Sequence, residues 1–130
     1  MQRLFHFSDF HISLNSGMPA ENRNFQALLT ELGEFKCSDA SNYIAFSGDV
    51  IDNGYISKQA DPNKARKECY ELAIDYFREL RDALNVPKEN LVFCCGNHDV
   101  IRGEYTGAHA LCDPAVNYST VLFSDGYSAF

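Results

Sequence analysis

Three short polar motifs carry the side chains of this sequence that are best suited to chemistry. They occupy residues 9–11 (DFH), 48–54 (GDVIDNG) and 96–99 (GNHD). Together they offer carboxylates, imidazoles and an amide oxygen, a mixed donor set that suits Mn, Fe or Zn. A histidine also titrates near neutral pH, so it can act as an acid or base. The motifs therefore predict metal-assisted or acid–base chemistry.

Each motif taken alone also has a simpler interpretation. The first is also typical of a turn aspartate beside a surface histidine, and the other two of solvated polar turns. Residues i and i+2 of an extended segment point the same way, so Asp9 and His11 can reach one cation. Asp52 follows Asp49 by three residues and can fold back toward the same place. Gly96 allows the backbone to approach closely.

The segments before the motifs have the pattern of buried strands. Residues 3–7 (RLFHF), 42–47 (NYIAFS) and 90–95 (NLVFCC) are apolar runs that stop at polar turns. Between them, apolar residues recur at helical spacing over about 22–35 and 62–84. Strands that alternate with helices predict an α/β fold, a parallel sheet with flanking helices and right-handed crossovers. Ligands of such sheets bind at the carboxyl ends of the strands, where all three motifs would meet.

The helix ends carry their own signals. Asp61 is an expected N-cap and Pro62 suits the first turn of the second helix, while Asn85 ends it. For the first helix, Asn22 and Asn24 are both candidate caps.

Length and composition limit the class of protein. The 130 residues correspond to about one domain, with 45% hydrophobic residues and a net charge of 11 − 18 = −7. That charge gives no evident nucleic-acid surface. No apolar stretch approaches a membrane span and no signal peptide is visible. The five cysteines include no CxxC pair, which favours reduced thiols in a cytoplasmic protein. Cys94 and Cys95 are adjacent, so on a strand they point to opposite faces rather than forming a zinc clip.

The order and spacing of the three motifs resemble the calcineurin-like metallophosphoesterase superfamily. Its signature is DxH, GDxxD and GNH[DE], followed by two histidine motifs, the last being GHxH. The resemblance implies a four-layer α/β/β/α sandwich, of which this chain is the N-terminal half. It also implies a hydrolase of phosphomonoesters or phosphodiesters that uses two divalent metal ions (Mn, Fe or Zn) and a metal-bridging hydroxide.

The resemblance assigns a metal-binding role to four residues. Asp9 and His11 would bind the first metal, Asp49 would bridge both, and Asn97 would bind the second. His98 would not be a ligand but would protonate the leaving oxygen of the phosphoester or stabilise its charge.

Further residues would serve the substrate and the acid. Asp52 is the candidate partner that orients His98. Asn97 and His98 would both contact the phosphoester substrate. Arg102 is a candidate phosphate contact because it follows the third motif closely, although a solvated surface arginine is the simpler interpretation.

The sequence departs from the family pattern after the third motif. Its four histidines are His6, His11, His98 and His109, and it contains no GHxH. We therefore expect domain 1–130 to be incomplete at its C-terminus. One alternative function is an inactive or partner-completed fragment, a metal-binding or assembly module that forms a homo-oligomer or needs the missing half. Another, within the superfamily, is a nuclease.

Overall fold

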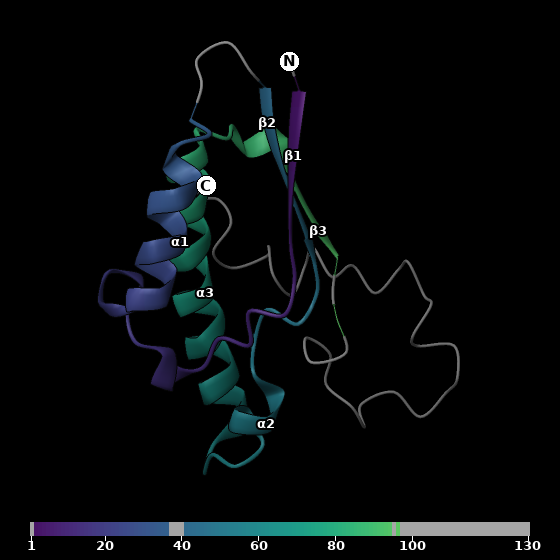
Figure 1. The fold of residues 1–130 in the computed structure, drawn as a ribbon. Helices are drawn as coiled ribbons and strands as arrows, with labels where there is room; N and C mark the ends of the chain where they lie inside the picture. Colours follow the sequence, from purple (N-terminus) through teal and green to yellow (C-terminus); the bar gives the residue numbers. More distant parts are fainter. Residues whose placement is uncertain (1, 37–40, 95, 97–130) are drawn as a thin grey trace, which may run out of the picture. The chain divides into compact units, whose positions relative to one another are not determined.

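The computed structural model describes residues 2–36, 41–94 and 96. Along the chain lie β1 (Gln2–Phe7), α1 (Arg23–Gly33), β2 (Ser41–Ser47), α2 (Asn53–Ile56), α3 (Pro62–Leu84) and β3 (Leu91–Cys94) (Figure 1). Three short 3-10 helices cover Leu14–Ser16, Pro19–Glu21 and Lys88–Asn90. Among the described residues, no helix is long and apolar enough to cross a membrane.

The three strands form one parallel sheet in the order β1-β2-β3. Phe46 of β2 lies opposite Phe7 of β1 and Phe93 of β3, which fixes the register of all three strands. The predicted α/β fold with a parallel sheet and flanking helices is confirmed. In this arrangement all three strands end at the same edge of the sheet, so the three motifs begin there.

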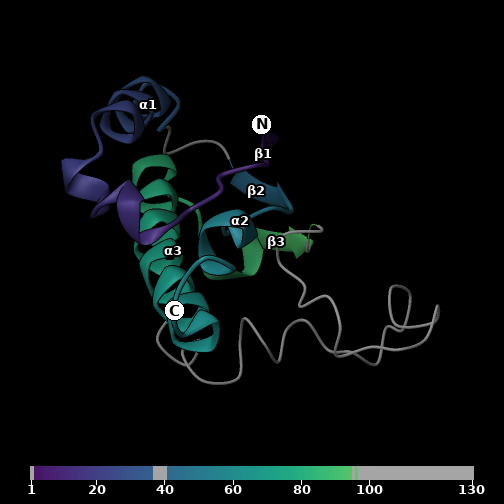
Figure 2. The same ribbon diagram turned by 90° about the horizontal axis from the view of Figure 1, so that it is seen from below.

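Helices α1 and α3 cover one face of the sheet, as both ribbon views show (Figures 1 and 2). Burial alternates along β2, where Asn42, Ile44 and Phe46 are buried beneath the helices. On the opposite face, which we call the open face, no helix of the described residues packs, and Leu4 and Val92 are 68% and 57% exposed. The described residues therefore contain one helix-covered sheet, which corresponds to half of the expected sandwich.

The core is built mainly by the inner face of α3. Its buried side chains recur every three or four residues, which is the spacing of one helix face. They contact the helix-covered face of the sheet and the buried residues of α1. The buried positions of α3 are Ala65, Cys69, Leu72, Ala73, Tyr76, Phe77, Leu80 and Leu84.

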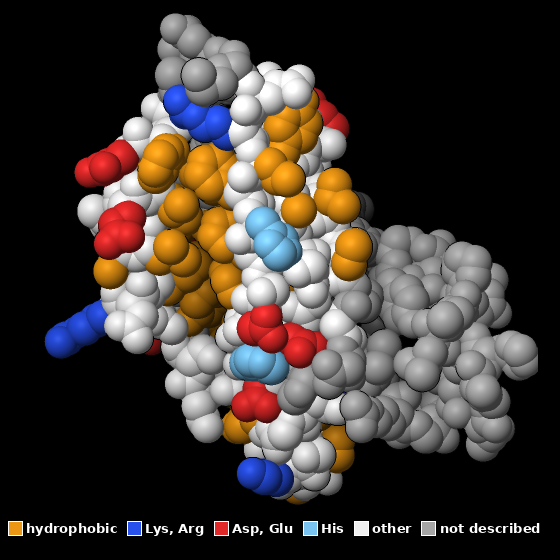
Figure 3. All heavy atoms as spheres, turned by 45° about the vertical axis from the view of Figure 1, so that its right-hand side comes forward, with side chains coloured by type: hydrophobic (Ala, Val, Ile, Leu, Met, Phe, Trp, Pro, Cys, Tyr) orange, Lys and Arg blue, Asp and Glu red, His pale blue; other side chains and the backbone are white. Residues whose placement is uncertain are grey.

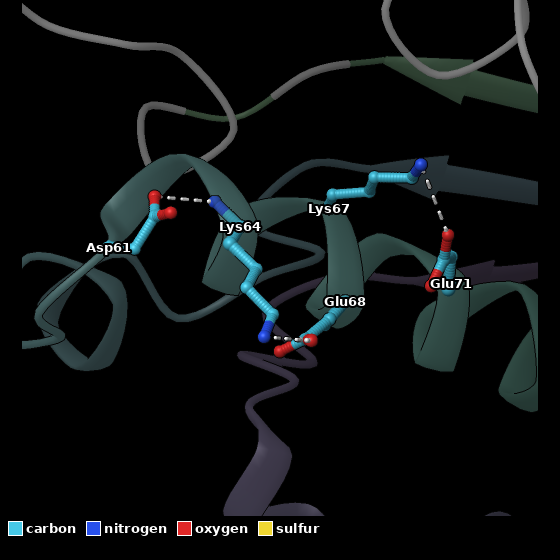
Figure 4. Close-up of polar contacts among 5 residues, drawn as sticks. All are labelled: Asp61, Lys64, Lys67, Glu68 and Glu71. Carbon is cyan, nitrogen blue, oxygen red and sulfur yellow. Dashed lines mark hydrogen bonds and ion pairs between the residues drawn. The ribbon is translucent and has the colours of Figure 1, made fainter.

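The ends of α3 match the sequence prediction. The Asp61 carboxylate accepts a hydrogen bond of 3.0 Å from the backbone N–H of Lys64, and Pro62 occupies the first turn (Figure 4). Asn85 ends the helix in the left-handed conformation, with φ of 52°. The exposed pairs Lys64–Glu68 and Lys67–Glu71, also drawn in Figure 4, contribute little because water screens them.

The first helix and a short unpredicted one are also capped by side chains. Asn22, rather than Asn24, caps α1 by accepting a hydrogen bond from the N–H of Phe25 at 3.1 Å. Helix α2 was not predicted because four residues are too few to show a periodic pattern. Asp52 caps it through the N–H of Tyr55 at 3.0 Å, and the fully buried Ile56 anchors its last turn.

Candidate metal centre

Two loops at the carboxyl ends of β1 and β2 bring three candidate ligands together. Asp9 and His11 follow β1 and Asp49 follows β2, and each offers one donor atom within 4.8 Å of the others. Acidic and histidine side chains gather visibly at this end of the sheet (Figure 3). The predicted convergence of the first two motifs is therefore present in the structure.

The backbone conformation of the ligand residues differs from the extended conformation that we expected for residues 9–11. Asp9, His11 and Asp49 have φ values of 56°, 46° and 54°, in the left-handed region, and Gly48 has φ of 100°. The expectation that residues 9–11 are extended was wrong. Two kinked residues flank Phe10, and the kinks, not strand alternation, turn both ligand side chains toward Asp49. Such backbone conformations are uncommon outside glycine and persist where the surrounding structure holds them.

Backbone hydrogen bonds between the two loops hold these conformations. They join the segment after β1 to the segment after β2 and extend the parallel pairing beyond the strands. The four bonds run from Asp9 N–H to Gly48 O (3.1 Å), His11 N–H to Asp49 O (3.0 Å), Ile12 N–H to Val50 O (2.8 Å) and Asp52 N–H to Ile12 O (2.9 Å). Each ligand loop is therefore fixed by its neighbour.

Phe10 anchors the first loop to the core. Its ring centroid lies 4.9 Å from that of Phe46 and 5.9 Å from that of Phe77, within the aromatic cluster beneath the helices. Because Phe10 points inward, its neighbours remain at the surface: the side chains of Asp9 and His11 are 65% and 40% exposed. The hydrophobic core thus presents both candidate ligands to solvent.

The charges of the group favour a bound cation. The Asp9 Oδ1 atom lies 3.9 Å from His11 Nε2, and the Asp49 carboxylate lies within the same cluster. Two carboxylates held this close repel each other, and a divalent cation between them removes that repulsion. Two carboxylates with one imidazole form the mixed O/N donor set that Mn, Fe and Zn accept. The residues present therefore fit a metal of this class.

Gly96, the first residue of the third motif, lies at the same place. A methyl group built on Gly96 would lie 2.8 Å from Asp49 Cγ, and closer still to Asp49 Oδ1 and to its backbone nitrogen. The chain that leaves β3 therefore runs directly against Asp49, and only a residue without a side chain fits there. The predicted close approach at Gly96 is confirmed.

The similarity of the sequence to a known family agrees with this geometry. The sequence model of one family, described as calcineurin-like phosphoesterase, matches residues 2–128. The chain belongs to the calcineurin-like phosphoesterase family. The comparisons with curated proteins and with solved structures gave no match. This family is metal-dependent, and in this chain Asp9, His11 and Asp49 form the candidate metal-binding group.

The structure describes only some of the remaining predicted site residues. Asp52 is not part of the three-residue group, and its carboxylate is engaged at the start of α2. Its predicted role as the partner of His98 stays a prediction. Asn97, His98 and Arg102 lie outside the described residues, as does Cys95.

One polar pair near the site was not found by sequence reasoning. His6 Nε2 and Ser47 Oγ lie 2.7 Å apart on the open face of the sheet. The sequence contains no motif at His6 that would indicate this pair. A cross-strand partner becomes visible only once the register of β1 against β2 is known.

Proposed function

We propose that this protein is a metal-dependent phosphoesterase with a dinuclear centre at the carboxyl ends of its strands. The observation that carries the proposal is the meeting of Asp9, His11 and Asp49 donors within 4.8 Å in a member of the calcineurin-like phosphoesterase family. The substrate class is a phosphomonoester or phosphodiester.

The proposed ligand assignment follows the family pattern. Asp9 and His11 would hold the first metal, Asp49 would be shared with the second, and Asn97 would hold the second. The contact between Gly96 and Asp49 supports the last assignment, because Asn97 is the next residue along the chain. The mixed donors suit Mn, Fe or Zn.

Metals bound by these residues would supply Lewis-acid polarisation of the phosphoryl group and activation of water. His98 protonates the leaving oxygen, a contribution of roughly 10²–10⁴-fold in general acid catalysis. Asp52 orients His98. Its own position is supported by two hydrogen bonds, in which its carboxylate accepts from Tyr55 N–H and its backbone N–H donates to Ile12 O. Arg102 is a proposed phosphate contact.

Titration of Mn²⁺ into the protein, with hydrolysis of bis-p-nitrophenyl phosphate measured in parallel, tests this proposal. Asp49→Asn should weaken Mn²⁺ binding by at least about 100-fold, because it removes a charged ligand shared by both metals. Asp82→Asn is the matched control: its side chain is 69% exposed and bonded to Arg81 in α3, so binding should not change. Absence of Mn²⁺ binding, or full binding by Asp49→Asn, would contradict the site assignment.

The open face of the sheet favours a second candidate function, that of an assembly module. Leu4 and Val92 are both exposed there, on the two strands that flank β2, and large exposed apolar patches mark interaction surfaces. Light scattering of the protein in solution distinguishes a self-associating module from a monomer. A dimer that becomes a monomer on Leu4→Asp substitution supports a self-association surface, whereas a monomeric unmodified protein argues against one.

A further inference from the structure

His6 and Ser47 form a hydrogen-bonded pair where the two ligand loops begin. The distance from His6 Nε2 to Ser47 Oγ is 2.7 Å, and both residues lie on the open face of the sheet. His6 comes three residues before Asp9, and Ser47 comes two residues before Asp49. The pair is therefore a side-chain connection between the two strands that lead to the candidate metal centre.

The bond lies where regular strand pairing ends. The strands β1 and β2 stop pairing at Phe7 and Phe46, and the next backbone bond runs from Asp9 N–H to Gly48 O. The side-chain bond spans this transition on the open face, where the neighbouring side chains of β2, Tyr43 and Ala45, are partly buried. It holds the two strands in register at the point where both chains turn.

The turn after Ser47 depends on being held. Gly48 and Asp49 are two successive residues with positive φ, 100° and 54°. Conformations of this kind persist only where the surrounding structure determines them. A fixed Ser47 side chain fixes the start of this turn, and the turn sets the position of the Asp49 carboxylate relative to Asp9.

We propose that His6 and Ser47 are positioning residues that hold Asp49 in place for metal binding. The inference rests on the proposed function and extends it to two residues outside the three motifs. Neither residue is assigned as a ligand; they act through the Gly48–Asp49 turn. Loss of one solvent-exposed hydrogen bond of this kind corresponds to about a 2- to 5-fold change in affinity.

Electron paramagnetic resonance of free Mn²⁺, titrated against the full 130-residue chain, measures the effect. The disruptive variants are Ser47→Ala, His6→Ala and the double variant. Ser47→Thr retains the hydroxyl, and His6→Gln retains a polar nitrogen at a similar distance from the backbone. Ser41→Ala is the matched control, because Ser41 lies at the opposite end of β2 on the same open face and is also exposed.

Each disruptive single variant should weaken Mn²⁺ binding about 2- to 5-fold. The double variant should bind Mn²⁺ no more weakly than the single variant with the lower affinity. Ser47→Thr and His6→Gln should restore most of the affinity, and Ser41→Ala should bind like the unmodified chain. The inference is wrong if Ser47→Ala binds normally while Asp49→Asn loses binding, or if the two alanine effects simply multiply. An unmodified chain that binds no Mn²⁺ would overturn the proposed function and this inference together.

Discussion

The contact between Gly96 and Asp49 makes Gly96→Ala the most informative single substitution. The added methyl group would lie 2.8 Å from Asp49 Cγ, whereas non-bonded carbon atoms rest at about 3.5 Å. Asp49 or the chain after β3 must therefore move by at least roughly 0.7 Å, and Asp49 Oδ1 and the Asp49 nitrogen are closer still. The nitrogen belongs to the backbone, so rotation of the Asp49 side chain does not remove the clash.

Two magnitudes follow from this displacement. Overpacking of this kind costs about 1–3 kcal/mol of stability. Ligand groups must be held to within about 0.5 Å of their working geometry, so a shift of Asp49 should weaken Mn²⁺ binding by roughly 10- to 100-fold.

Urea unfolding and Mn²⁺ titration of Gly96→Ala, beside Gly33→Ala, test this reasoning. Gly33 ends α1, and a methyl group built there meets nothing within 4 Å. Gly33→Ala should be neutral or stabilise the protein by up to about 1 kcal/mol, with unchanged Mn²⁺ affinity. A Gly96→Ala protein with normal stability and normal Mn²⁺ affinity would refute the close contact assigned between Gly96 and Asp49.

Three further predictions concern the scaffold and are all measured by urea unfolding. Asp61→Ala should lose about 0.5–2 kcal/mol by removing the cap of α3, and Asp61→Asn should retain most of it; equal losses would argue against capping. Leu84→Ala should cost about 2–5 kcal/mol because Leu84 is fully buried, while Leu4→Ala, at an exposed position, should change little; similar effects would contradict the burial assigned to α3. Burial raises the pKa of the Cys69 thiol above its ordinary value of 9.0, against a backbone hydrogen bond at Leu14 that lowers it. As the pH rises, the thiol therefore ionises in the unfolded chain before it ionises in the folded one. The stability gained by burying the neutral Cys69 thiol is complete below about pH 9, and it declines as the pH rises further. The unmodified protein should lose more stability than Cys69→Ala between about pH 8 and pH 10, and parallel profiles would contradict the raised pKa.

Local signals in the sequence predicted the regular elements well. The bounds of α3 were predicted to the residue because Asp61 with Pro62 marks its start and Asn85 its end. Helix α1 ends at Gly33, about two residues earlier than expected, because the apolar pattern continues to Phe35. Each strand was placed to within about one residue, since the polar motifs stop the apolar runs.

The candidate site could be predicted in composition but not in geometry. The types and order of Asp9, His11 and Asp49 were enough to predict that they converge. Their left-handed backbone could not be predicted, because it depends on hydrogen bonds between loops almost 40 residues apart in sequence. The His6–Ser47 pair has the same origin, since only the strand register brings these two side chains together.

We propose that Asp9, His11 and Asp49 bind the catalytic metal of this protein. Anomalous X-ray scattering from crystals grown with Mn²⁺ tests it most directly. We expect an anomalous peak within bonding distance of donor atoms from all three residues, and a second peak beside the Asp49 carboxylate. Saturating Mn²⁺ with no peak at Asp49, or with a peak only elsewhere on the molecule, would contradict it.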